Sequence, residues 1–255
     1  MARKFADEAI RKGCDYIITA GGDGTLNEVV NGIVPHQDQV RLGLLPLGTG
    51  NDFARCLKLP ADLEENFEIL AAARTKRIDL VRVTSDRTRY FLNVSAGGFS
   101  GAVNEKLTRA IKKRWGPLAY VRSAAAAFPE LRAYRTTIGF GRNESIALDL
   151  YNVVIANGRY VAGGLPIAPT ANLSDGLLDV ILIPQRPAAE MALLIAKILL
   201  GKHLRSDAIV FRRLPKISIR SRPGMWFNVD GELVGNEPAV FEIIPRALQF
   251  VVEKR

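Results

Sequence analysis

Two glycine-rich stretches, each carrying an aspartate, are the parts of this sequence best suited to chemistry. The first is GGDG at residues 21–24 and the second is PLGTGNDFAR at residues 46–55. Glycines between a strand and a helix let backbone N–H groups converge on an anion, and the helix N-terminus adds partial positive charge. An aspartate repels phosphate unless a Mg²⁺ ion lies between them or the carboxylate orients a reacting hydroxyl. The two stretches together predict a cleft for a nucleotide polyphosphate and its metal, whereas the first alone is equally compatible with an ordinary capped turn.

Strand–loop–helix units must position these stretches. Each stretch follows a short apolar run and opens an amphipathic one, and further helices are predicted at residues 1–12 and 62–75. Alternating strands and helices form parallel sheets, whose neighbouring strands end at the same edge. We therefore expect the two loops to lie side by side. Only two strands precede Arg77, so further strands must return from the far end of the chain or precede its beginning.

The pattern changes near Ile78. Beyond it, strand-like segments alternate with Gly, Pro or Asp, which predicts a mainly antiparallel β domain. Helices are predicted to interrupt this domain at about residues 117–134 and at 187–201.

Composition narrows the function classes. The formal net charge of +9 favours anionic partners, but no nucleic-acid-binding motif is recognisable. Two cysteines and two histidines, all far apart, argue against a disulfide framework, a zinc site or a histidine-based triad. The charged N-terminus does not read as a signal peptide, and the apolar segment 188–201 is too short to span a bilayer. We expect a cytoplasmic protein.

GGDGTLNEVVNG followed by PLGTGNDFAR resembles the diacylglycerol kinase catalytic family, the lipid kinases that include sphingosine and ceramide kinases, and its compact bacterial group in particular. GGDG alone is shared with NAD kinases and phosphofructokinases. RIDLVRV, FLNVSAGGFSG, GPLAYV, DGLLDVILI and VDGE follow in the family's order. The resemblance implies an α/β ATP-binding domain at residues 1–77 with a return strand at 246–255. It also implies a β-sandwich lipid-substrate domain at 78–245, with the active site in the cleft between them.

The implied activity is Mg²⁺-dependent transfer of phosphate from ATP to a lipid hydroxyl. Glu232 matches the family's general base, which accepts the hydroxyl proton. Asp23 and Asp52 are the other expected catalytic residues, beside a metal ion that bridges the ATP phosphates. The expected nucleotide-binding residues are Gly22, Asp23, Gly24, Thr25, Leu26, Asn27, Glu28, Thr49 and Asn51.

A second acidic loop, PTANLSDGLLDV at residues 169–180, matches a separate family Mg²⁺ site. The ligands would be the Asp175 carboxylate and the carbonyls of Asn172 and Leu177. Asp79 matches a family aspartate linked to this metal through water. A capped turn without an ion remains the alternative.

The lipid has to be reached from a membrane. Residues 106–128 combine lysines and arginines with aromatic residues and an apolar helix, a composition typical of an interfacial segment on anionic lipid. A solvated basic helix packed on the β domain is the alternative. The resemblance also suggests a homodimer and peripheral contact with the inner membrane surface.

The sequence departs from the family at its start, where a strand and an NPxSG-like loop normally precede GGDG. A truncated sequence, a misassigned start and a natural short form are three explanations. A natural short form would favour a different function, a lipid- or nucleotide-binding module with weak or no catalysis. A soluble NAD kinase is a further alternative to the lipid kinase. Among acceptors, diacylglycerol is favoured by the DGE triplet at 230–232, while phosphatidylglycerol and sphingoid bases stay open.

Overall fold

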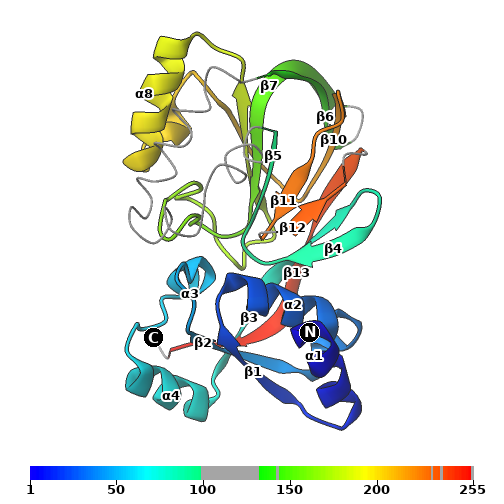
Figure 1. The fold of residues 1–255 in the computed structure, drawn as a ribbon, viewed down its shortest axis with the longest axis vertical. Helices are drawn as coiled ribbons and strands as arrows, with labels where there is room; N and C mark the ends of the chain where they lie inside the picture. The colour runs from blue at the N-terminus through cyan, green and yellow to red at the C-terminus, as the bar shows by residue number, and fades with distance from the viewer. Residues whose placement is uncertain (99–131, 142–143, 231, 236–237, 254–255) are drawn as a thin grey trace.

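A computed structural model of the protein describes residues 1–98, 132–141, 144–230, 232–235 and 238–253. Two lobes lie one above the other along the longest axis, with the N-terminal helices in the lower lobe and most of the strands in the upper lobe (Figure 1). The chain forms an α/β N-terminal lobe joined to a mainly antiparallel β-sheet lobe, so the fold class predicted from the sequence is confirmed.

The N-terminal lobe contains α1 (Ala2–Arg11), β1 (Tyr16–Gly21), α2 (Asp23–Ile33), the 3-10 helix η1 (Val34–Gln39), β2 (Arg41–Pro46), α3 (Asp52–Leu57) and α4 (Leu63–Ala72). β1 and β2 pair in parallel, with Gly21 opposite Pro46, so both strands end at the same edge of the sheet. Val30 of α2 and Leu42 of β2 are fully buried in one apolar cluster. The predicted helices, strands and parallel pairing are confirmed.

Two strands from later in the chain extend this sheet. β13 (Ala239–Val251) lies parallel to β2, with Phe250 opposite Leu42, and β3 (Thr75–Thr84) lies antiparallel to β13. Phe250 meets Phe53 of α3 edge to face, with a centroid distance of 5.3 Å. The C-terminal end of the chain thus provides β13 for the first lobe, which is one of the two sources of strands that the strand count required.

The C-terminal lobe contains β4 (Thr88–Phe91), β5 (Val94–Gly98), β6 (Tyr134–Gly141), β7 (Glu144–Ala156), β8 (Leu178–Pro184), α8 (Ala188–Leu199), the 3-10 helix η3 (His203–Arg205), β9 (Val210–Leu214), β10 (Lys216–Arg222), β11 (Phe227–Val229) and β12 (Glu232–Val234). The strands follow the antiparallel order β10-β6-β7-β5-β11-β12, and β8 and β9 join at β7. β10 shows the alternation expected of such a sheet, because Ile217 and Ile219 are buried between exposed residues.

Two long strands, β3 and β13, run through both lobes. In β3, Leu80 belongs to the apolar core of the N-terminal lobe and Val81 to that of the C-terminal lobe. In β13, the same change occurs between Ile243 and Ala247. The predicted domain boundaries, at residues 77/78 and 245/246, fall inside these strands and remain predictions.

The structure differs from the predicted elements at three places after residue 78. β9 was not predicted, because its sequence VFRRL has two exposed arginines among five residues. The last two predicted strands form one strand, β13, with an irregularity between Ile244 and Leu248. The helix predicted at 117–134 lies outside the described residues up to 131, and Tyr134 begins β6 instead.

Candidate active site

The two glycine-rich loops touch each other through their backbones. Gly22 is the N-cap of α2, and Gly48 lies in the loop after β2. A Cβ on Gly48 would stand 2.5 Å from the Cα of Gly22, which no real side chain tolerates. The N–H of Leu47 donates to the carbonyl of Gly21 at 3.1 Å. The glycines are therefore required by the close approach, and the loops form one surface at the edge of the sheet, as expected.

Asn51 shapes the second loop from within. Its φ of 51° is left-handed, a conformation that asparagine tolerates better than most residues. Its side-chain oxygen accepts the N–H of Gly48 at 3.0 Å, and its amide donates to the carbonyls of Pro46 and Gly48 at 3.0 and 2.7 Å. Asn51 thus fixes the loop, while Thr49 in the same loop is exposed.

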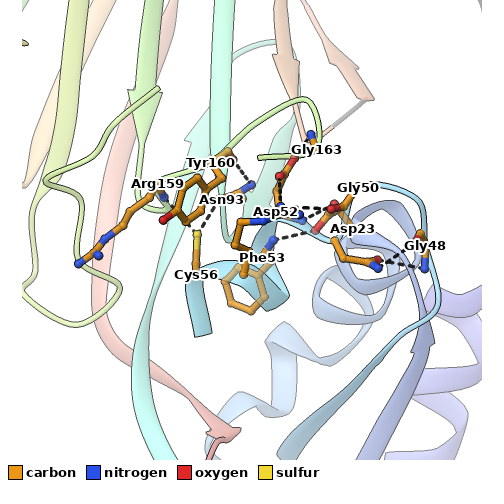
Figure 2. Close-up of polar contacts among 12 residues, drawn as sticks. Asp23, Gly48, Gly50, Asp52, Phe53, Cys56, Asn93, Arg159, Tyr160 and Gly163 are labelled. Carbon is orange, nitrogen blue, oxygen red and sulfur yellow. Dashed lines mark hydrogen bonds and ion pairs between the residues drawn. The ribbon is translucent and has the colours of Figure 1, made fainter. Parts of the chain in front are cut away.

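Asp23, the first residue of α2, reaches across to the start of α3 (Figure 2). Its two carboxylate oxygens accept the N–H groups of Asp52 and Phe53 at 3.1 and 3.0 Å. Asn51, the N-cap residue of α3, makes no side-chain cap, so Asp23 supplies the cap from the other loop. The aspartate that looked out of place beside a phosphate therefore fastens the two loops together.

Asp52 connects the two lobes. One carboxylate oxygen is paired with Arg55 at 2.7 Å and the other accepts the N–H of Gly163, in the loop between β7 and β8, at 2.9 Å (Figure 2). Burial raises the pKa of Asp52, and the nearby Asp23 charge adds to that rise, while the N–H of Gly163 and the guanidinium of Arg55 oppose it. The Asp52 side chain is therefore held in place by Arg55 of its own helix and by the N–H of Gly163 on the other lobe.

Asp230 belongs to the DGE triplet, but no role in the site is predicted for it from the sequence. It occupies the Asp-Gly turn between β11 and β12, with a left-handed φ of 44°. Its carboxylate accepts the N–H groups of Leu92 and Val94, both at 3.1 Å. Burial raises the pKa of Asp230 to about 6, against these hydrogen bonds, and the charge of Asp23 contributes to the rise. The hairpin turn of the C-terminal lobe therefore lies close to the first glycine-rich loop.

Three of the expected nucleotide-binding residues direct their side chains elsewhere. Leu26 is buried in the core of the N-terminal lobe. The side-chain oxygen of Asn27 accepts from Asn31 at 2.7 Å, and the carboxylate of Glu28 accepts from the backbone nitrogens of Met1 and Ala2. Any contact of these residues with a nucleotide would have to come from their backbones. The exposed Gly24 and Thr25 stand at the first turn of α2.

The expected magnesium loop is already occupied by a cation of the chain itself. Arg213 of β9 contacts the carboxylate of Asp175 and donates to Asp179 at 2.8 Å. Asp175 also accepts the N–H of Leu177 at 3.1 Å, and the buried Asp179 accepts the hydroxyl of Thr170 at 2.5 Å. Nothing in the sequence pattern had pointed to Arg213, which lies in the strand that was not predicted.

The other predicted members of that loop are also held by hydrogen bonds. The fully buried Asp79 accepts the N–H groups of Gly176 and Arg246 at 2.8 and 2.7 Å, and the Asn172 side chain accepts from Ser174. Among the described residues, no group of three or more His, Cys, Asp or Glu side chains could hold a metal ion. The Asp175 carboxylate is thus paired with the Arg213 guanidinium in this structure, and the metal role of Asn172, Asp175 and Leu177 stays a prediction.

Glu232 begins β12, two residues after Asp230, so its backbone lies beside the turn that faces Asp23. The candidate membrane segment 106–128 lies outside the described residues.

Comparisons with known proteins bear on what this arrangement can do. Residues 1–83 match the family described as the diacylglycerol kinase catalytic domain, and residues 93–252 match the YegS C-terminal NAD kinase beta sandwich-like domain. A diacylglycerol kinase of Staphylococcus haemolyticus is 31% identical over 98% of this chain and 74% of that protein. One from Staphylococcus epidermidis is 32% identical over 98% of this chain and 78% of that protein. The chain belongs to the diacylglycerol kinase family.

Solved structures agree with this assignment at the level of the fold. A diacylglycerol kinase from Bacillus anthracis has a TM-score of 0.80 and 23% identity, covering 99% of this chain and 82% of that one. Family membership places the chain among kinases and accounts for two aspartate-bearing loops at the edge of a sheet. None of the helices described for this family member has the length and apolar character needed to cross a bilayer.

Proposed function

We propose that this member of the diacylglycerol kinase family is an ATP-dependent lipid kinase that converts diacylglycerol to phosphatidic acid. The observation that carries the proposal is the meeting of three elements. The two glycine-rich loops touch at Gly22 and Gly48, and the turn at Asp230 lies close to Asp23. We infer from this that a donor site on one lobe faces the strand that carries the candidate base on the other.

The start of α2 would bind the ATP phosphates. Gly22 caps this 11-residue helix without a side-chain hydrogen bond, so the N–H groups of Asp23, Gly24 and Thr25 are available to an anion. A Cβ on Gly24 would meet no atom within 4 Å, so the approach to these groups is open. The exposed hydroxyls of Thr25 and Thr49 would donate to phosphate oxygens.

Asp23 and Asp52 are expected to play two parts. Their hydrogen bonds to Phe53 and Gly163 hold the loops and the lobes in register, which sets the geometry of in-line transfer. The remaining lone pairs of their carboxylates would face the Mg²⁺ that ATP brings with it. That ion would neutralise phosphate charge.

Glu232 is the proposed general base. A lipid hydroxyl is a poor nucleophile at neutral pH, so its proton passes to the Glu232 carboxylate as its oxygen attacks the γ-phosphorus. The bond between the γ-phosphorus and the bridging oxygen breaks, and ADP leaves with that electron pair. General-base assistance of this kind contributes roughly 10²–10⁴-fold in rate.

The acceptor would be taken from a membrane. The net charge of +9 favours an anionic bilayer surface, and we expect peripheral contact on the cytoplasmic side, in phospholipid biosynthesis. We propose residues 78–245 as the lipid-substrate domain and residues 1–77 with 246–255 as the ATP-binding domain. A homodimer remains a prediction.

The direct test is transfer of labelled phosphate from [γ-³²P]ATP to mixed-micelle diacylglycerol. Wild-type protein, Glu232→Gln and the matched control Glu68→Gln, an exposed residue of α4, would be compared at equal concentration. We expect labelled phosphatidic acid from the wild type and the control. Glu232→Gln should lose at least 100-fold, within the roughly 10²–10⁴-fold range of base catalysis.

The same assay separates the alternatives. Parallel reactions with phosphatidylglycerol, a sphingoid base and NAD identify the acceptor, and NADP formation would point to an NAD kinase. Wild-type transfer no higher than the protein-free background on every acceptor would favour a binding module and refute the proposal. A version extended upstream of Met1 tests whether an additional segment raises the rate.

A further inference from the structure

The strand that carries Glu232 is short and lies at an edge. β12 has three residues, and within the described part of the chain its strand partner is β11, also of three residues. A ladder this short fixes a side chain poorly, because isolated short hairpins are marginal in water. A general base has to be held within hydrogen-bond reach of its proton, so other contacts must fix β12.

The first contact is at the turn that precedes β12. The carboxylate of Asp230 accepts the N–H groups of Leu92 and Val94, and its own N–H donates to the carbonyl of Val94 at 3.3 Å. These three hydrogen bonds attach the turn to Leu92, two residues before β5, and to Val94, its first residue. Asp230 itself has a left-handed backbone, with a φ of 44°.

The second contact is at the other end of β12. The tip of the β3–β4 hairpin supplies Asp86 and Arg87. Arg87 donates from its guanidinium to the carbonyl of Leu233 at 2.7 Å, and the Asp86 carboxylate accepts the N–H of Gly235 at 3.1 Å. A Cβ at Gly235 would run into the Asp86 carboxylate, so this glycine allows the approach.

We propose that Asp86 and Arg87 are positioning residues for Glu232, acting together with Asp230. The proposal rests on the function proposed above, in which Glu232 is the base. Holding both ends of β12 fixes where Glu232 sits relative to the phosphate loops. A displacement of about 1 Å can cost 10²-fold in rate. The hydrogen bonds of Arg87 to Leu233 and of Gly235 to Asp86 lie within the C-terminal lobe, so their loss should impair transfer and leave ATP binding intact.

Steady-state kinetics on paired variants test this. Arg87→Ala and Asp86→Ala should lower kcat about 10- to 100-fold with an unchanged KM for ATP. Arg87→Lys and Asp86→Asn should recover most of the loss, because a lysine can still donate to Leu233 and an amide oxygen can still accept from Gly235. Arg89→Ala is the matched control, since the Arg89 guanidinium donates to the carbonyl of the neighbouring Thr88, and this variant should retain the wild-type kcat.

Amide hydrogen exchange gives a second readout that does not depend on activity. We expect faster exchange at Leu233 and Val234 in Arg87→Ala, with exchange in β1 and β2 unchanged. Wild-type kcat in both alanine variants, or a rise in the KM for ATP that matches the fall in kcat, would overturn the positioning role. If Glu232→Gln is inactive in that case, the proposed function still stands. A fully active Glu232→Gln would instead remove the base assignment.

Discussion

Replacing Asp230 with asparagine should change how stability depends on pH. The Asp230 carboxyl has a pKa of about 6 in the folded protein, raised by burial and then by Asp23, against an ordinary value of 3.8. The folded chain therefore holds this proton more tightly than the unfolded chain does. Between about pH 4 and pH 6 the folded state binds more protons, so the free energy of unfolding falls as the pH rises.

The size of the effect follows from the shift. A difference of about two pKa units corresponds to about 3 kcal/mol, since each unit is worth 1.36 kcal/mol. This loss of folding stability, which ionisation of the buried carboxyl causes, is absent below about pH 4 and complete above about pH 6. Asparagine keeps one acceptor oxygen but turns an N–H₂ toward a backbone N–H, so the variant loses a hydrogen bond at every pH. Only the part of the stability difference between wild type and Asp230→Asn that changes with pH therefore measures the titration of the carboxyl.

The assay is urea unfolding of wild type and Asp230→Asn at intervals from pH 4 to pH 8. As the pH rises across this range, the free energy of unfolding of the variant should increase by about 3 kcal/mol relative to that of the wild type. Asp207→Asn, which replaces an exposed aspartate, should run parallel to the wild type. A difference between wild type and Asp230→Asn that stays constant with pH would show that the carboxyl titrates normally, and would refute the picture of a desolvated acid facing Asp23.

Two further predictions concern the loops. Gly48→Ala should lower the free energy of unfolding by about 1–3 kcal/mol, because its Cβ would meet the Gly22 backbone. Gly24→Ala has open space around its Cβ and should be neutral or stabilising. Thermal unfolding of the two variants and the wild type measures the difference. The second prediction concerns the loop at Asp175. EDTA should leave the melting temperature of the wild type unchanged, because Arg213 already neutralises Asp175. The Arg213→Ala variant should have a lower melting temperature, which added Mg²⁺ should raise again. A wild-type melting temperature that falls in EDTA would show that a metal holds this loop.

Much of the fold could be predicted because its signals are local. The strand–loop–helix units can be predicted from the periodicity of apolar residues and from the glycines that follow each strand. The antiparallel lobe can be predicted from the alternation of apolar and polar residues along its strands. β9 escaped prediction because neither face of VFRRL reads as a regular core face. The path of β13 through both lobes is set by packing that no local pattern records, as in the contact of Phe250 with Phe53.

The site was predictable to the same extent. Sequence reasoning identified Asp23 and Asp52 and expected the two loops to be neighbours, because parallel strands that are adjacent end together. It could not assign partners to their carboxylates. Gly163 is 111 residues from Asp52, and Leu92 is 138 residues from Asp230. An Asp-Gly pair reads as a turn wherever it occurs, so Asp230 carried no signal of its own.

The three carboxylates bear on how the proposed acidic site would accept an anionic nucleotide. Each one accepts N–H groups from a different element: Asp23 from the start of α3, Asp52 from the loop at Gly163, and Asp230 from the start of β5. Assembly of the site therefore consumes much of their hydrogen-bonding capacity but leaves their like charges close together, which is why Asp23 raises the pKa of both other acids. A cation arriving with a nucleotide would relieve that repulsion as it binds. Binding of Mg²⁺ and nucleotide together should consequently stabilise the folded protein more than the sum of their separate effects.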